Sequence, residues 1–290
     1  MLVSVIMAAY DAERWIGEAI ESVLAQTYED WELLVADDGS RDGTVAAVRG
    51  YGDPRIRLLE ASHAGVLGHV RNRAIEAARG EVIALLDADD AWAPRKLELQ
   101  LGLLADRPEV GVVHTGAELL VDGTRRPGPA PPGGPLVRNL LANNFIYSSS
   151  AAIRRELLDE HGTFDPDPGL RGSPDYELWL RLAPLTEFAY IPGPLLAYRV
   201  HGGQMSAGRR EMELGALLAL EKAAAKSPQL AVREREAWLR ACGMRRCLAG
   251  LPGRGRRELL GALVRRPWAV ATWKWLVRGA LPQRSRRTSS

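Results

Sequence analysis

Short apolar runs alternate with amphipathic stretches through the first 115 residues, and this alternation restricts the fold more than any other feature. A short apolar run rich in β-branched residues predicts a buried strand, whereas apolar residues that recur every three or four positions predict a helix. Strands and helices in alternation predict an α/β fold with a mainly parallel sheet flanked by helices. The expected strands are residues 2–9, 31–36, 55–60 and 81–86, and the expected helices are 11–24 (capped by Asp11), 44–51 and 70–79.

The remaining residues continue with less regular patterns. We expect a helix over 94–104, an extended segment over 110–121 that ends at the turn Asp122-Gly123, and another strand over 145–153. Ser173 followed by Pro174 predicts the start of a helix, since serine caps helices and proline fits their first turn. Residues 209–280 have helical patterns and predict a C-terminal helical extension.

The charge of the chain is divided between two regions. The net charge is +2, but residues 1–208 carry −11 and residues 209–290 carry +13. An acidic body with a basic extension indicates that the two parts meet different partners.

Composition and the N-terminal sequence bear on where the protein works. With 46% apolar and 26% charged residues, the chain is neither disordered nor collagen-like. We expect a cytoplasmic protein, because no apolar run reaches 18 residues and the N-terminus lacks the basic region of a secretory signal. The two cysteines, Cys242 and Cys247, fit neither a zinc site nor a disulfide framework and are interpreted as packing residues.

Acidic residues follow two of the expected strands, as Asp37-Asp38-Gly39-Ser40 and as Asp87-Ala88-Asp89-Asp90. Ligands of open α/β sheets bind beyond the carboxyl ends of the strands. Clustered carboxylates repel one another unless a divalent cation or ligand hydroxyls occupy the site, and oxygen ligands favour Mg or Mn over zinc. Taken singly, the first motif is equally typical of an Asx turn through Gly39, and the second of an acidic helix cap.

Six segments in this order resemble the family 2 inverting glycosyltransferases of GT-A fold. They are Val3-Ser4-Val5-Ile6-Met7-Ala8-Ala9-Tyr10, Ser22-Val23-Leu24-Ala25-Gln26-Thr27, Asp37-Asp38-Gly39-Ser40, Arg71-Asn72, Gly80-Glu81 and Asp87-Ala88-Asp89-Asp90. The resemblance covers roughly residues 2–206 and implies a Rossmann-like, nucleotide-diphospho-sugar transferase fold. It implies a catalytic domain over 1–208, with a nucleotide-sugar-binding half over 1–115 and an acceptor half over 116–208, followed by the basic extension over 209–290.

The resemblance also implies roles for individual residues. Ser173-Pro174-Asp175-Tyr176-Glu177-Leu178-Trp179-Leu180 is similar to the family motif E-D-x-x-L-W, in which the aspartate is the catalytic base, although Pro174 stands where glutamate is more usual. The implied base is Asp175. Tyr198-Arg199-Val200-His201 is similar to a motif that closes over the diphosphate. The implied nucleotide-sugar-binding residues are Ala9, Tyr10, Asp38, Arg71, Asp87 and Arg199, and the implied ligands of Mg or Mn are Asp89, Asp90 as the close alternative, and His201.

The activity implied is transfer of one sugar from a nucleotide-diphosphate sugar, with a UDP sugar favoured, to a hydroxyl of a glycan or a lipid-linked acceptor. This is a metal-dependent, inverting, hexosyltransferase-type reaction of surface glycan or polysaccharide biosynthesis. The Q-x-x-R-W motif of processive synthases is absent from the sequence, so we expect a non-processive enzyme. A sugar nucleotidyltransferase is the first alternative, although no glycine-rich, lysine-bearing loop follows the first expected strand. An inactive glycan- or nucleic-acid-binding relative is the second alternative.

The basic extension mixes arginine with tryptophan over residues 254–287. Cations beside aromatic residues are typical of segments that lie on an anionic membrane surface, so we expect peripheral attachment to the inner membrane face. The alternative is that the tryptophans pack on the catalytic domain or on a second subunit. A nucleic-acid partner is not expected, because clustered carboxylates in the body would contribute nothing to it.

Overall fold

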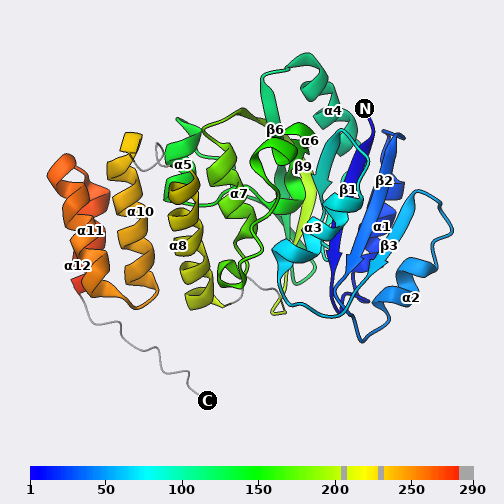
Figure 1. The fold of residues 1–290 in the computed structure, drawn as a ribbon, viewed down its shortest axis with the longest axis horizontal. Coiled ribbons are helices and arrows are strands. Elements are labelled where there is room, and N and C mark those ends of the chain that lie inside the picture. Colours follow the sequence, from blue (N-terminus) through cyan, green and yellow to red (C-terminus); the bar gives the residue numbers. More distant parts are fainter. Residues whose placement is uncertain (204–207, 228–231, 281–290) are drawn as a thin grey trace.

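The computed structural model describes residues 1–203, 208–227 and 232–280. The first part of the chain forms a parallel β/α unit (Figure 1). Its strands pair in parallel in the order β3-β2-β1-β4, as the alternation predicts. Each predicted strand and helix of this part is confirmed in type and approximate position, although α1 begins five residues later than predicted. The elements are β1 (Val3–Ala9), α1 (Ile16–Leu24), β2 (Trp31–Asp37), α2 (Thr44–Arg49), β3 (Ile56–Glu60), α3 (Leu67–Ala77) and β4 (Val82–Leu85).

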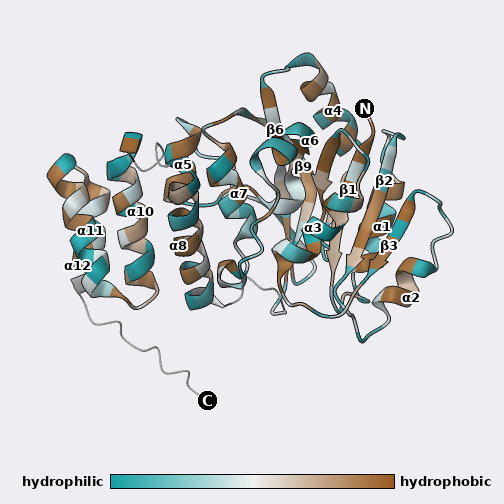
Figure 2. Cartoon of the chain, in the orientation of Figure 1, coloured by the Kyte–Doolittle hydropathy of each residue, from teal (hydrophilic) through white to brown (hydrophobic). Residues whose placement is uncertain are grey.

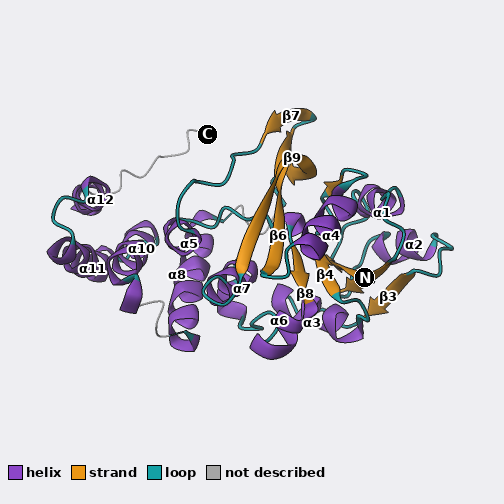
Figure 3. Ribbon diagram, turned by 90° about the horizontal axis from the view of Figure 1, so that it is seen from above, coloured by secondary structure: helices purple, strands orange, loops and turns teal. Residues whose placement is uncertain are grey.

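The second part extends the same sheet with strands of both directions. The sheet order is β3-β2-β1-β4-β8-β6-β9-β5, with β7 paired to β6; β8 is antiparallel to β4 and β6, and β9 is parallel to β6. Figure 3 shows helices on both faces of this twisted sheet. The strands are β5 (Ala91–Trp92), β6 (Val110–Val121), β7 (Thr124–Pro127), β8 (Ala152–Arg154) and β9 (Glu187–Val200), and the helices are α4 (Lys96–Asp106), α5 (Leu136–Ala142), η1 (Ser148–Ser150), α6 (Arg155–His161), η2 (Pro168–Leu170) and α7 (Pro174–Leu182).

Two local predictions are wrong. The strand expected over 145–153 is reduced to β8, because residues 148–150 form a short 3-10 helix in which Ser150 Oγ donates to the Tyr147 carbonyl at 2.7 Å. Serine hydroxyls that bond to nearby backbone compete with a strand ladder. Asp11 does not cap α1, which begins at Ile16; its carboxylate instead accepts the Arg41 backbone N–H at 2.7 Å.

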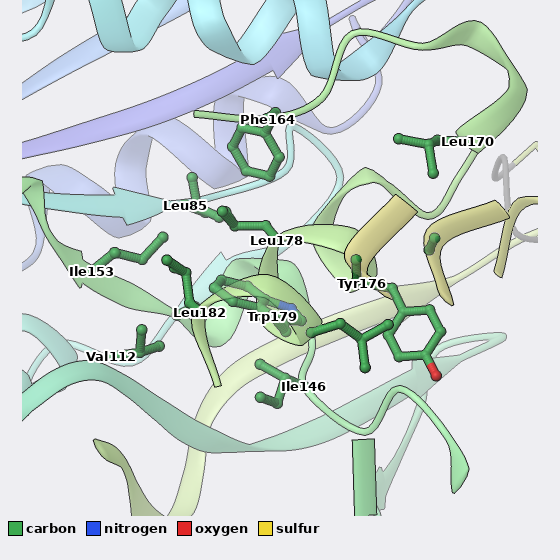
Figure 4. Packing of buried hydrophobic residues seen from close by; sticks show 14 of the residues in the cluster. Leu85, Val112, Ile146, Ile153, Phe164, Leu170, Tyr176, Leu178, Trp179 and Leu182 are labelled. Atoms are coloured by element: carbon green, nitrogen blue, oxygen red, sulfur yellow. The ribbon is translucent and has the colours of Figure 1, made fainter. Parts of the chain in front are cut away.

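Each face of the sheet carries its own hydrophobic core. Along β1, Val5 and Met7 belong to one core and Ile6 to the other, as the two-residue period of a strand requires. Figure 4 shows part of the core that contains Ile6. There Leu178, Trp179 and Leu182 of α7 pack in the same cluster as Ile153 of β8.

The C-terminal helices continue from α7 toward the end of the molecule farthest from β3 (Figure 1). Leu217 and Leu220 of α8 and Ala241 of α10 share the core that contains Tyr176 of α7, so α8 and α10 pack as part of the body. The helices are α8 (Arg209–Lys226), α10 (Arg235–Leu248), α11 (Pro252–Arg265) and α12 (Val270–Ala280). No helix among the described residues has the length and apolar character needed to cross a membrane.

Candidate functional site

The acidic turn after β4, residues 87–90, is held in place by a serine from a distant segment. Asp90 is 1% exposed, and its two carboxylate oxygens accept hydrogen bonds from Ser149 Oγ at 2.6 Å and from the Arg199 backbone N–H at 2.9 Å. Ser149 Oγ also accepts the Asp87 backbone N–H at 3.0 Å. Asp90 therefore holds the turn together, and this geometry favours Asp89 over Asp90 as the residue available to a metal ion.

Asp89 and His201 lie side by side at the edge of this turn. Their Oδ2 and Nε2 atoms are 3.0 Å apart, and both side chains are partly exposed. Burial and the neighbouring Asp87 raise the pKa of the Asp89 carboxyl. A carboxylate oxygen and an imidazole nitrogen are both suitable donors for Mn, and oxygen suits Mg. In residues 1–203, 208–227 and 232–280, no group of three or more His, Cys, Asp or Glu side chains could hold a metal ion.

Arg199 connects the end of β9 to the acidic turn and to α1. Its Nε donates to the Asp89 carbonyl at 2.9 Å, and its Nη2 pairs with Glu18 of α1 at 2.6 Å. The guanidinium also lies 4.2 Å from the Trp15 ring, whose centre is 6.0 Å from that of His201. Helix α1 therefore orients the residues predicted to close over a diphosphate.

Tyr10 and Asp38 occupy the carboxyl ends of the adjacent strands β1 and β2. The Tyr10 ring is 40% exposed and stacks on His63 with centroids 4.2 Å apart. Asp38 is buried and accepts the backbone N–H groups of Ala64 and Gly65, each at 2.9 Å, while its own N–H donates to the Ala9 carbonyl. This arrangement presents a flat aromatic surface beside an ordered carboxylate, which suits a planar heterocycle.

Arg71 of α3 joins this end of the site to the acidic turn. Its buried guanidinium pairs with Asp87 at 2.5 Å and lies 5.2 Å from the Phe164 ring. Its Nη1 is buried and has no hydrogen-bond partner among the residues that the structure describes. A buried cationic N–H without an acceptor is costly, so this atom is suited to an anionic ligand oxygen.

Asp175 lies in the first turn of α7, at the boundary predicted from Ser173-Pro174, although the Ser173 side chain makes no capping hydrogen bond. Its Oδ2 accepts a hydrogen bond from Asn144 Nδ2 at 3.0 Å. Burial raises the pKa of this carboxyl; the charge of Arg71 and the Asn144 hydrogen bond lower it, and the charge of Asp87 raises it. The charges of Arg71 and Asp87 therefore act in opposite directions on the pKa of the Asp175 carboxyl.

The structure brings the predicted residues together from six elements. Parallel β1, β2 and β4 deliver Tyr10, Asp38 and the acidic turn to one edge of the sheet, and α3, α7 and the end of β9 add the remaining groups. Sequence reasoning missed His63, Asn144, Ser149 and Glu18. Each of these contacts a site residue at least 25 positions away in the chain, and no local pattern marks such contacts.

The sequence matches known glycosyltransferases. Residues 4–162 match the family model "Glycosyl transferase family 2". The chain is 35% identical over 181 residues to WfgD of Escherichia coli, a UDP-Glc:alpha-D-GlcNAc-diphosphoundecaprenol beta-1,3-glucosyltransferase, a match that covers 62% of this chain and 69% of WfgD. It is 32% identical to TuaG of Bacillus subtilis, a glycosyltransferase named for teichuronic acid biosynthesis, over 72% of this chain and 82% of TuaG.

Solved structures show the same fold. Residues 1–349 of S. aureus TarS, in complex with UDP-GlcNAc, superimpose with a TM-score of 0.65 at 19% identity, and the match covers 96% of this chain and 89% of that TarS chain. The mannosyltransferase PcManGT of Pyrobaculum calidifontis, in complex with GDP-Man and Mn2+, superimposes with a TM-score of 0.64 at 22% identity, covering 96% of this chain and 84% of its own. The α/β fold with its helical C-terminal region is therefore the one shared by these enzymes.

Proposed function

Because the chain belongs to glycosyl transferase family 2, we propose that this glycosyltransferase moves one sugar from a nucleotide-diphosphate sugar to an acceptor hydroxyl with inversion at the anomeric carbon. One observation carries the proposal. The carboxylate of Asp175 lies within electrostatic reach of Arg71 and Asp87, so a candidate base and a candidate donor site share one cluster.

Asp175 is the proposed general base. An acceptor hydroxyl attacks a sugar carbon more readily when a carboxylate removes its proton during the attack. Burial raises the pKa of Asp175 above its ordinary value, which makes the carboxylate a stronger base, while Arg71 and Asn144 favour its ionised form. A single displacement of this kind inverts the anomeric configuration and involves no covalent sugar–enzyme bond.

The donor is proposed to lie across the carboxyl ends of β1, β2 and β4. The base of the nucleotide would lie near Tyr10 and Asp38, and the diphosphate near Arg71 and Arg199. The unpartnered Nη1 of Arg71 would donate to a phosphate oxygen and so stabilise the leaving group. The donors named for WfgD and TarS favour a UDP sugar, whereas PcManGT holds GDP-Man.

Mg or Mn is the proposed cofactor, held by Asp89 and His201 together with donor oxygens. These two side chains fit such an ion because they are adjacent and partly exposed. When bound, a divalent cation would offset the negative charge that develops on the departing nucleoside diphosphate.

The acceptor is proposed to be a glycan or a lipid-linked sugar of surface polysaccharide biosynthesis. The names of WfgD and TuaG support this class of acceptor. A lipid-linked acceptor would place the reaction at a membrane, and the basic extension is proposed to attach the protein to the anionic inner face.

The test is a panel of UDP, GDP and dTDP sugars, each incubated with a water-soluble analogue of diphosphate-linked GlcNAc, with Mn, with Mg or with a chelator. We expect acceptor-dependent release of nucleotide from one class of donor, in the presence of metal, and a product of inverted configuration by NMR. Retention of configuration would exclude the single displacement. Release from no donor would favour the inactive, glycan-binding alternative.

A further inference from the structure

Exposed large apolar side chains are concentrated at the C-terminal end of the molecule. Six of them fall within residues 260–277 of α11, α12 and their connection, and each is between 51% and 80% exposed. We call this set the outer face; it comprises Leu260, Val264, Trp268, Val270, Trp273 and Val277. Figure 2 shows hydrophobic residues interleaved with hydrophilic ones along both helices.

Helical geometry places these side chains on the side of each helix that faces away from the body. Leu259, Ala262 and Leu263 of α11 are buried, and Gly255 approaches Gly243 of α10 so closely that a Cβ at either position would meet the other's carbonyl at 2.7–2.8 Å. Leu260 and Val264 are one turn apart on the opposite side of α11, and Val270, Trp273 and Val277 share one side of α12. The inner side of the pair is therefore satisfied by packing, and the outer side has no cover in the described part of the chain.

The charge around the outer face has a single sign. No Asp or Glu follows Glu258, whereas seven Arg or Lys residues occur between 259 and the C-terminus. Among the described residues of α11, α12 and their connection, Arg265, Arg266 and Lys274 are exposed between the outer-face residues. Apolar side chains interspersed with cations suit a surface that is apolar below and anionic above, which describes the headgroup region of an anionic bilayer.

We propose that the outer face of α11 and α12 docks the protein in the plane of an anionic lipid bilayer, with Trp268 and Trp273 at headgroup level. Tryptophan is favoured at that depth, and the leucine and valine side chains supply the apolar area that enters the acyl boundary. This inference rests on the proposed function in one respect, since a lipid-linked acceptor gives the docking its purpose.

A second copy of this chain is a less suitable occupant. A twofold interface places the same patch of both subunits together, so Arg265, Arg266 and Lys274 would meet their own counterparts. Like charges brought together at an interface are unfavourable, and the cores of subunit interfaces are depleted in charge. An anionic bilayer instead neutralises each of these cations.

The test is cosedimentation of the full chain with vesicles of phosphatidylcholine alone or with phosphatidylglycerol. We expect binding to the anionic vesicles at low salt and loss of most of it at high salt. Val264→Ser combined with Trp268→Ser should weaken binding about tenfold or more, because it removes inserted apolar area. Arg265→Ala with Arg266→Ala should weaken it by roughly 25-fold, since each arginine contributes a factor of about five. The matched control is Val232→Ser, which changes a valine that is 68% exposed but lies outside the outer face.

Two vesicle results would overturn the proposal: equal binding of all variants to anionic vesicles, or failure of the wild-type chain to bind them. Sedimentation velocity tests whether a second copy of this chain occupies the outer face instead. A dimer that Val264→Ser converts to a monomer would identify the face as a subunit interface and overturn the proposal. Transfer to the water-soluble acceptor is measured in parallel. Transfer by the wild-type chain without vesicle binding overturns the docking and leaves the proposed transferase activity standing. Vesicle binding without transfer from any donor overturns the proposed transferase activity and leaves the docking standing.

Discussion

Asn144 donates a hydrogen bond from Nδ2 to Oδ2 of Asp175 at 3.0 Å, and its own Oδ1 accepts the Ile146 backbone N–H at 3.2 Å. Five residues later in the same segment, Ser149 bonds to Asp90 and to the backbone of Asp87. One segment between α5 and β8 therefore contacts both the proposed base and the acidic turn of the donor site. A shift of this segment would alter both groups together.

Removing the Asn144 side-chain amide should change the pH dependence of transfer. The hydrogen bond lowers the pKa of Asp175, so Asn144→Ala should raise that pKa and move the acid limb of kcat/KM to higher pH. We also expect kcat to fall about tenfold, the worth of a hydrogen bond to a charged group. The measurement is the pH profile of nucleotide release with saturating acceptor.

Two further variants make this result specific. Asn144→Asp keeps an acceptor for Ile146 but places a second carboxylate against Asp175, so it should move the acid limb further in the same direction. Asn139→Ala, which changes an asparagine whose side-chain amide donates to the backbone carbonyls of residues 132–134, should leave the profile unchanged. An unchanged profile in both Asn144 variants would mean that the residue does not act on the base.

Neutralising the proposed base should separate catalysis from donor binding. Asp175→Asn keeps the size of the side chain but removes its ability to accept a proton, so transfer should fall by at least about 100-fold. Affinity for the nucleoside diphosphate, measured by calorimetry, should stay within a few-fold of the wild type, because Asp175 is not among the residues proposed to hold it. Near-normal turnover would place the base elsewhere.

Neighbouring serines allow the bracing of the acidic turn to be tested. Ser149→Ala removes the donor to buried Asp90 and the acceptor of the Asp87 N–H, and leaving such groups unpaired costs about 1–3 kcal/mol each. We expect a lower melting temperature and a raised KM for the donor. Ser148→Ala is the matched control, since Ser148 Oγ is buried without a hydrogen-bond partner and its removal should be neutral or stabilising. Equal behaviour of the two variants would show that the brace is unimportant.

Much of this architecture is predictable from sequence because strands and helices leave periodic signals. The parallel β1 to β4 unit and the start of α7 at Pro174 follow from apolar spacing and from the chemistry of serine and proline at a helix start. The strand over 145–153 is wrong because a run of apolar and aromatic residues resembles a strand even where serine hydroxyls bond locally. The contacts of Asn144, Ser149 and His63 depend on how distant segments are brought together, which no single segment encodes.

Loss of the candidate metal ligand should make nucleotide binding insensitive to metal. We expect UDP, or the nucleotide of whichever donor is used, to bind more tightly with Mn than with a chelator, and Asp89→Ala to abolish the difference. Its partner His201 lies 3.0 Å away, so His201→Gln should reduce the difference rather than remove it. The readout is calorimetric titration of the nucleotide in each buffer. Metal-independent binding of the wild type, equal to that of Asp89→Ala, would argue against this site.

The stability of the body should fall on mild acidification because of His114. This residue is 4% exposed on β6, beside Phe145 and Tyr190, and burial lowers its pKa from 6.5 to about 4. Between these two pKa values the unfolded chain binds a proton that the folded chain excludes. The contribution of neutral His114 to the free energy of unfolding is therefore complete above pH 6.5 and is lost progressively as the pH falls toward 4. At pH 5 the loss amounts to roughly 2 kcal/mol of the free energy of unfolding. Denaturant unfolding at pH 7.5 and pH 5 should show a smaller difference for His114→Gln than for the wild type, whereas the exposed His69→Gln should behave as the wild type does. If His114→Gln loses as much stability as the wild type between these two pH values, His114 is not the group that titrates.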